Sequence, residues 1–139
     1  MWAAALRLPG VFTDHAVVQH SRRLAVWGWA EPGRKVVVDF RGASARTVAD
    51  EAGRFEAAID AGPPGGPFDL FVRSNGQTQV VRDVLVGEVW LGAGQSNMAM
   101  ALDRTEGSAA DIAGARDPGL RLFTVPRTPA SCPVADVSG

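Results

Sequence analysis

The stretch Gly94-Gln95-Ser96-Asn97 is the part of the sequence whose residue types and spacing could carry out a reaction. It follows the apolar run "VLVGEVWL" and precedes "MAMAL", which is made of helix formers. A hydroxyl where a buried strand meets a helix is a candidate nucleophile, because open α/β sheets build their sites beyond the carboxyl ends of their strands. The spacing alone leaves open the simpler alternative that Ser96 only caps the helix.

If Ser96 is a nucleophile, its neighbours have definable roles. The backbone N–H of Ser96 would help to stabilise an oxyanion while the side chain attacks a carbonyl carbon. Gly94 would let a substrate approach the backbone closely, because glycine has no Cβ. Gln95 and Asn97 would lie near the substrate. The stretch therefore predicts a catalytic Ser96 and an oxyanion-binding turn made by Ser96 and Gly94.

Two other motifs fit the same stretch less well. A dinucleotide-binding G-x-G-x-x-G motif would need a third glycine at position 97, where the chain has asparagine. A G-x-S-x-G nucleophile elbow would need a small residue at position 98, where the chain has methionine. We therefore favour a serine at the end of the first strand of a flavodoxin-like sheet.

The remaining polar residues give weaker signals. His15 and His20 are the only histidines, and both fall in a predicted β-region, which favours a structural or surface role. Four carboxylates have the spacing of exposed helix and loop charges: Asp103, Glu106, Asp111 and Asp117. No group of Cys, His and Asp residues has metal-ligand spacing, so we expect neither a metal nor a cofactor.

Tryptophan, serine and cysteine residues elsewhere are interpreted structurally. Trp27, Trp29 and Trp90 have the setting of packing residues, with sugar stacking as the alternative. Ser108 and Ser131 lack a glycine-rich setting and are expected to be a cap and a loop residue. The chain has one cysteine, so no disulfide can close within it.

The overall composition restricts the class of protein. The chain has 139 residues, 46% of them hydrophobic and 21% charged, and a net charge of −1, as is typical of a globular domain. A concentrated positive charge is missing, which argues against nucleic-acid binding. No apolar run approaches the ~18 residues of a membrane span. No signal peptide is recognisable before Arg7, so a cytoplasmic location and secretion to the periplasm or beyond after processing both stay open.

The elements that position these residues can be predicted from the hydrophobic pattern. Residues 6–82 contain short β-type runs separated by turn signals, a pattern typical of a sandwich or barrel. The runs are 16–19, 24–29, 35–41, 45–49, 54–59, 68–73 and 77–82. The turn "SNG" at 74–76 predicts a hairpin, because Asn and Gly tolerate a positive φ.

The pattern changes after Arg82. We predict a buried strand over 84–91, a helix over "SNMAMAL", a second helix that begins at Ser108 with a capping box to Asp111, and a strand over 120–125. The turn "DPG" at 117–119 would stop the second helix. This predicts an all-β sandwich domain over 1–83 and the first β-α-β portion of a parallel α/β domain over 84–139.

One β-α-β unit is too small to cover both faces of a parallel sheet. We therefore expect the α/β domain to be truncated and the chain to be a fragment. The alternative is that this unit packs against the β-domain and is complete.

Several blocks of the sequence resemble the sialate O-acetylesterase family, which belongs to the SGNH hydrolases and is related to acetylxylan esterases. The block "GEVWLGAGQSNMAM" is similar to that family's nucleophile block, and "LPGVFTDHAVVQ" is similar to its N-terminal signature. Further similar blocks follow in the same order: "LAVWGWAEPGRKVVVDF", "TVADEAGRFEAAI", "GGPFDLFV" and "LRLFTVP". The resemblance runs from about Leu6 to Pro126.

This resemblance implies a β-sandwich followed by an SGNH esterase domain, with Ser96 as the nucleophile and its N–H as one oxyanion donor. It also implies a base and further donors in later blocks that these 139 residues do not contain. Where the family often has Glu after the methionine, this chain has Ala99.

The expected substrate is an acetylated carbohydrate, and the isolated chain should be inactive without a His–Asp pair. Its expected partner is the remainder of the SGNH domain. The alternative function is a non-catalytic β-sandwich module that binds a glycan or a partner chain.

Overall fold

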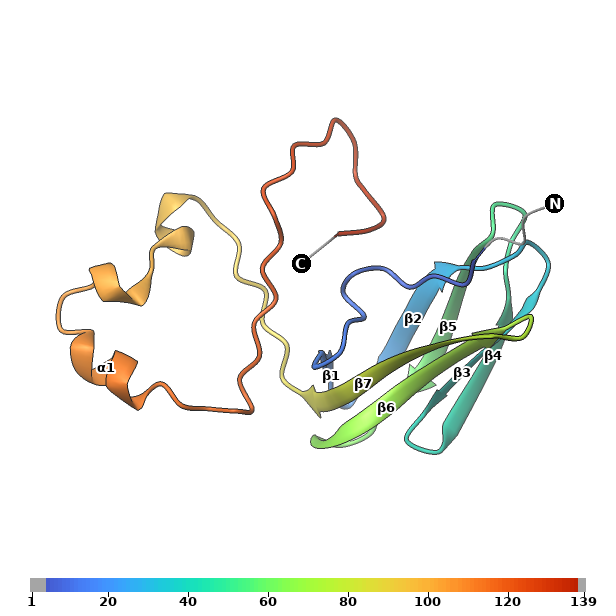
Figure 1. Ribbon diagram of the computed structural model, residues 1–139, viewed down its shortest axis with the longest axis horizontal. Coiled ribbons are helices and arrows are strands. Elements are labelled where there is room, and N and C mark those ends of the chain that lie inside the picture. The colour runs from blue at the N-terminus through green and yellow to red at the C-terminus, as the bar shows by residue number, and fades with distance from the viewer. Residues whose placement is uncertain (1–4, 138–139) are drawn as a thin grey trace. The chain divides into compact units, whose positions relative to one another are not determined.

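The computed structural model describes residues 5–137, and the chain divides into two compact units. Figure 1 labels the strands and the α-helix. One unit contains residues 1–89 and 123–139, and the other contains residues 90–122. The described strands belong to the first unit and the described helices to the second. We call the strand-bearing part of the first unit, residues 5–89, the β-domain.

The β-domain contains two sheets. A five-stranded sheet has the order β1-β7-β6-β3-β4, and a two-stranded sheet pairs β2 with β5. All pairs are antiparallel except β1 with β7, which run parallel. The strand bounds are β1 Val17–Gln19, β2 Arg23–Trp29, β3 Lys35–Phe40, β4 Ala43–Val48, β5 Arg54–Asp60, β6 Gly65–Ser74 and β7 Gln77–Gly87. The predicted β-rich region is confirmed.

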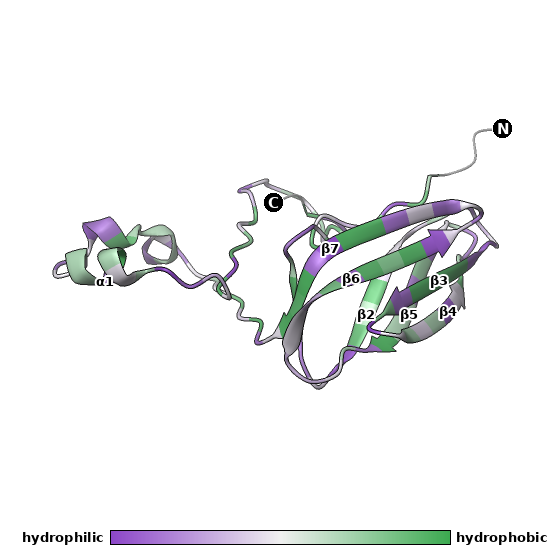
Figure 2. Ribbon diagram, turned by 60° about the horizontal axis from the view of Figure 1, so that its bottom comes forward, coloured by the Kyte–Doolittle hydropathy of each residue, from purple (hydrophilic) through white to green (hydrophobic). Residues whose placement is uncertain are grey.

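Alternating side chains build one hydrophobic core for this domain. In β5, Phe55, Ala57 and Ile59 are buried while the residues between them are exposed, as the period of two predicts. In β3, Val36, Val38 and Phe40 are almost completely buried. Figure 2 shows hydrophobic residues along these strands. Burial of each large apolar side chain contributes about 1.5–3 kcal/mol, so the alternation is the main source of stability.

The hairpin between β6 and β7 has the predicted two-residue turn. Ser74 pairs with Gln77, and Asn75 and Gly76 between them have φ values of 46° and 77°. Positive φ at both central positions is the geometry that matches the twist of the flanking strands. The prediction made from "SNG" is therefore confirmed.

The two strands predicted beyond Arg82 form only in part. β7 is one strand that continues to Gly87, and residues 88–91 are not in a strand. The strand predicted over 120–125 is wrong, because these residues have no regular structure. A strand needs a partner for its N–H and C=O groups, and within residues 5–137 no strand pairs with either segment. The predicted β-α-β unit is therefore not formed.

The helical predictions also hold only in part. Instead of one helix, the stretch "SNMAMAL" contains one 3₁₀ turn, η1 (Ser96–Ala99), and its last residue begins a second, η2 (Leu102–Arg104). The second helix is confirmed as α1 (Ala109–Gly114), but Ser108 makes no side-chain cap hydrogen bond, so the predicted capping box is wrong. Segments of this length form a stable helix only when an apolar face packs against the rest of the protein. None of the described helices has the length and apolarity needed to cross a bilayer.

Candidate functional site

Ser96 is the first residue of η1 and is exposed to solvent. Gln95, in an extended conformation, precedes it and accepts a hydrogen bond from the N–H of Met98 at 2.9 Å. Residues 88–95, which follow β7, are not in a strand. The hydroxyl is therefore accessible, but an irregular segment separates it from β7, whereas the sequence predicts a strand that continues to Leu91.

Met98 lies close to Gly92 and Gly94. A Cβ added to Gly94 would lie 3.5 Å from Cβ of Met98, and one added to Gly92 would lie 3.5 Å from its Sδ. Both are ordinary van der Waals distances, and neither glycine has a positive φ. Neither a backbone constraint nor a clash within the protein therefore requires glycine here. Its value would be the open approach that it offers to a ligand.

The serine has no base among its described partners. Within residues 5–137, neither the hydroxyl nor the N–H of Ser96 forms a hydrogen bond. His15 pairs with Asp83, and His20 pairs with Glu88, both within the β-domain. The structural role predicted for the two histidines is thus supported by carboxylate partners on strand β7 and just beyond it.

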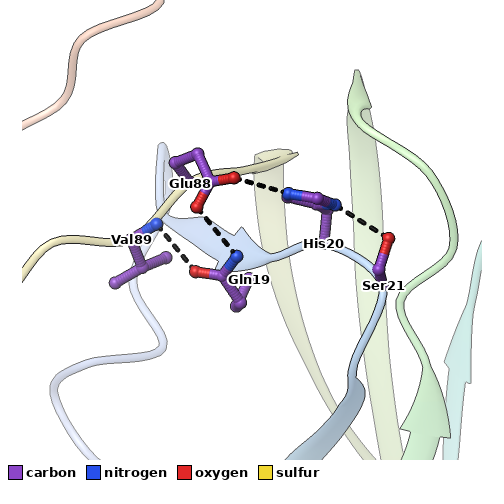
Figure 3. A network of polar contacts seen from close by, with 5 residues as sticks. All are labelled: Gln19, His20, Ser21, Glu88 and Val89. Carbon is purple, nitrogen blue, oxygen red and sulfur yellow. Dashed lines mark hydrogen bonds and ion pairs between the residues drawn. The ribbon is translucent and has the colours of Figure 1, made fainter.

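Gln19, His20 and Glu88 form a connected group, which we call the clasp (Figure 3). His20 Nε2 lies 2.6 Å from Glu88 Oε1, and Gln19 Nε2 donates to Glu88 Oε2 at 3.1 Å. The Oε1 atom of Gln19 accepts the backbone N–H of Val89 at 2.9 Å. The other imidazole nitrogen, Nδ1, lies 2.8 Å from Ser21 Oγ. The clasp thus joins the end of β1 to the two residues that follow β7.

The electrostatics of the clasp depend on Glu88. Hydrogen bonds from the Gln19 amide and then the His20 ring lower the pKa of Glu88, although its side chain is 62% exposed. An ionised Glu88 accepts a hydrogen bond from the Nε2–H of His20; in the neutral imidazole with that tautomer, Nδ1 accepts the hydroxyl proton of Ser21. The carboxylate of Glu88 therefore accepts a hydrogen bond at each of its two oxygens.

Two of the three tryptophans pack as predicted. Trp27 makes an edge-to-face contact with Phe12 at a centroid distance of 4.9 Å, and the Arg7 guanidinium lies 3.8 Å from the ring centroid of Trp29. Trp90 is 88% exposed, so its predicted packing role is wrong for the residues described. Its segment has no partner strand, and the ring therefore finds no apolar surface to cover it.

The other candidate residues do not assemble into a site. The carboxylates of Asp103, Glu106, Asp111 and Asp117 are exposed, as predicted. Asp117 caps its own turn through the N–H of Gly119 at 2.8 Å. Within residues 5–137, no cluster of three or more His, Cys, Asp or Glu side chains could hold a metal ion.

The sequence did not reveal the clasp. Its parts lie 68 to 70 positions apart, and only the tertiary pairing of β1 with β7 brings them together. The available signal was local: a polar Gln19-His20 pair ends one apolar run, and Glu88 interrupts another. Polar residues at the ends of two strands that pair in parallel lie at the same edge of a sheet.

Comparison with known proteins shows which enzymes this chain resembles. No family model matches the chain. It is 30% identical to sialate O-acetylesterase of Rattus norvegicus over 145 residues, which cover 96% of the chain and 27% of that protein. It is 33% identical to the human sialate O-acetylesterase over 87 residues, which cover 55% of the chain and 17% of that protein. The chain thus spans about a quarter or less of these relatives.

A solved structure gives the same indication. The crystal structure of a carbohydrate acetylesterase from Xanthomonas citri matches 97% of the chain with a TM-score of 0.89 and 38% sequence identity. The match covers 31% of that protein. Together, these comparisons confirm the resemblance to the sialate O-acetylesterase family that the sequence blocks indicate.

Proposed function

We propose that the chain is the N-terminal part of a serine carbohydrate esterase that removes O-acetyl groups from sialic acid or another acetylated glycan. The observation that carries the proposal is the exposed Ser96 in a Gly-Gln-Ser-Asn turn, within a chain similar to acetylesterases over nearly its whole length. In this proposal, residues 1–83 form a β-sandwich and residues 84–139 begin an SGNH domain.

Exposed apolar side chains in the second part support this division. Trp90 and Leu91 are 88% and 90% exposed, and Leu122 is 87% exposed. Runs of large apolar residues are rarely left in water unless another surface covers them. We infer that these residues belong to core strands of an α/β domain whose remaining strands come from further sequence or from a separate chain.

The proposed reaction is acyl transfer through Ser96. Its Oγ would attack the acetyl carbonyl carbon, and backbone donors including its own N–H would hold the oxyanion. The sugar hydroxyl would leave with a proton, and water would then release acetate from the acetyl-enzyme. Gly94 would leave room for the acetyl group, and Gln95 and Asn97 would face the sugar. The base that takes the Ser96 proton would come from outside these 139 residues.

The experiment compares two lengths of chain with p-nitrophenyl acetate. The 139-residue chain should hydrolyse it no faster than buffer, because Ser96 has no base to activate it. A longer chain that includes the later blocks with the base and the further oxyanion donors should turn over, and Ser96→Ala should lower its kcat by about a thousandfold or more.

Ser131→Ala is the matched control, because it removes an exposed serine from an irregular segment and should leave kcat unchanged. Turnover by the 139-residue chain that Ser96→Ala abolishes would contradict the requirement for an outside base. Full activity of the longer Ser96→Ala chain would remove Ser96 as the nucleophile.

A further inference from the structure

We propose that the clasp of Gln19, His20 and Glu88 positions the chain segment that leads to Ser96, so that Gln19 and Glu88 are positioning residues for the nucleophile. This inference rests on the proposed function, since the starting point of this segment matters to catalysis only if Ser96 reacts. The physical basis lies at the end of the β1–β7 ladder.

The backbone ladder between β1 and β7 stops at Gly87. Gln19 is the last paired residue of β1, opposite Gly87, and the N–H of His20 makes the final backbone bond, to the carbonyl of Gly87 at 2.9 Å. At Ser21 the backbone takes a φ of 53°, and its N–H bonds instead to Gly62. No backbone of β1 is therefore left to pair with Glu88 and Val89.

The Gln19 side chain takes the place of that missing backbone. A side-chain amide has the donors and acceptor of a peptide group. Its Oε1 accepts the N–H of Val89 at 2.9 Å, as a strand carbonyl would, and its Nε2 donates to Glu88. The Gln19 side chain thus makes one strand-like hydrogen bond, to the backbone of Val89, two residues past the end of β7. Its other bond goes to the side chain of Glu88.

Glu88 is held from two sides. Gln19 bonds to one carboxylate oxygen, and His20, itself in contact with Ser21 Oγ, bonds to the other at 2.6 Å. The carboxylate therefore cannot rotate without losing one of the two bonds. Because Glu88 is adjacent to Val89, the clasp fixes the backbone of both residues.

Stability alone does not explain this arrangement. Exposed ion pairs and hydrogen bonds contribute little to folding, and three side chains must be ordered to form the clasp. What the clasp determines is the point from which the segment toward Ser96 starts. Only residues 90–95 separate Val89 from Ser96, a reach of at most about 24 Å at roughly 3.5 Å per residue. Holding Val89 in place limits the positions that Ser96 can reach, and small displacements of a nucleophile are costly.

Three variants separate positioning from folding. Gln19→Ala removes the acceptor for Val89 and the donor to Glu88. Gln19→Glu keeps the acceptor but sets two carboxylates against each other. The double variant Gln19→Glu with Glu88→Gln exchanges the two groups and rebuilds every bond, because the amide now at position 88 would donate to the new carboxylate and accept from His20. The double variant should restore the properties of the wild type only if the hydrogen bonds between positions 19, 88 and 89 are what matters.

The first measurement is amide hydrogen exchange on the 139-residue chain. Exchange of the Val89 N–H should be about threefold to tenfold faster in Gln19→Ala and return to the original rate in the exchanged pair. The Leu85 N–H, which bonds to Ala16 at 3.0 Å in the same ladder, should not change and serves as the internal control. Unchanged exchange at Val89 would show that the clasp does not form and would overturn the proposal.

The second measurement uses the longer chain that contains the base. Gln19→Ala should lower kcat about tenfold with KM within about twofold, and the exchanged pair should restore kcat. Faster exchange at Val89 with an unchanged kcat would show that the clasp stabilises the local structure but does not position Ser96, and would overturn the proposal. If the unmodified longer chain shows no activity that depends on Ser96, the proposed function fails and this inference with it. Failure of the proposed function can be told apart from failure of the clasp, because the exchange experiment reports separately whether the clasp forms.

Discussion

At the scale of single residues, the candidate nucleophile has no activating partner among residues 5–137. Ser96 is exposed on a short 3₁₀ turn, while His15 and His20 are paired with carboxylates of the β-domain. The motif around Ser96 is visible in the sequence because its four residues are consecutive. The partners of His20 are not, because Glu88 is 68 positions away.

The lowered pKa of Glu88 gives a pH prediction at this scale. Hydrogen bonds from Gln19 and His20 favour the ionised carboxylate in the folded state. Its contribution to stability is therefore present above the ordinary carboxyl range and is lost as the pH falls through the lowered pKa. Urea midpoints of the wild type and Glu88→Gln should converge as the pH falls below the ordinary carboxyl range, because other carboxylates titrate equally in both. A constant difference over this range would contradict the assignment.

At the scale of elements, strands are well predicted where their partners are present. The runs of the β-domain have the expected alternation, and "SNG" forms the expected turn. The apolar runs at 88–91 and 120–125 have strand-like composition but no strand structure. Composition makes a strand possible, whereas hydrogen bonding to a neighbour makes it form.

Gly28 tests how tightly one strand is packed. It is buried in β2, and an added Cβ would lie 2.3 Å from the carbonyl oxygen of Arg7 and 3.0 Å from Cζ of Phe55. Because the bridge between Arg7 and Trp29 holds that carbonyl in place, Gly28→Ala should lower the free energy of unfolding by about 1–3 kcal/mol. Urea denaturation of the 139-residue chain measures this.

Gly114→Ala is the matched control, since nothing lies within 4 Å of an added Cβ at the last residue of α1. Equal unfolding free energies for the two alanine variants would show that the contact at Gly28 relaxes without cost.

At the scale of the whole molecule, burial is very unevenly distributed. The β-domain contains the hydrophobic core, whereas in residues 90–122 Ser108 is the one buried side chain. Segments without buried apolar contacts open locally at little cost in free energy.

Limited proteolysis should show this difference. Trypsin is expected to cleave first after Arg104, Arg116 or Arg121 and to leave the arginines of the β-strands intact, as mass spectrometry of early digests would reveal. Early cleavage after Arg54 or Arg73, with residues 90–122 intact, would contradict the assignment of stability to the β-domain.

The sequence by itself determined the β-strands, their turns and the candidate nucleophile, because each depends on local periodicity or on consecutive residues. It also identified the family resemblance, since the similar blocks occur in order along the chain. Only the tertiary structure decided that β1 pairs in parallel with β7, that Gln19 and His20 meet Glu88, and that residues 88–95 and 120–125 are not strands. The reason is physical: these features depend on hydrogen bonds between segments far apart in the chain, which no local pattern records.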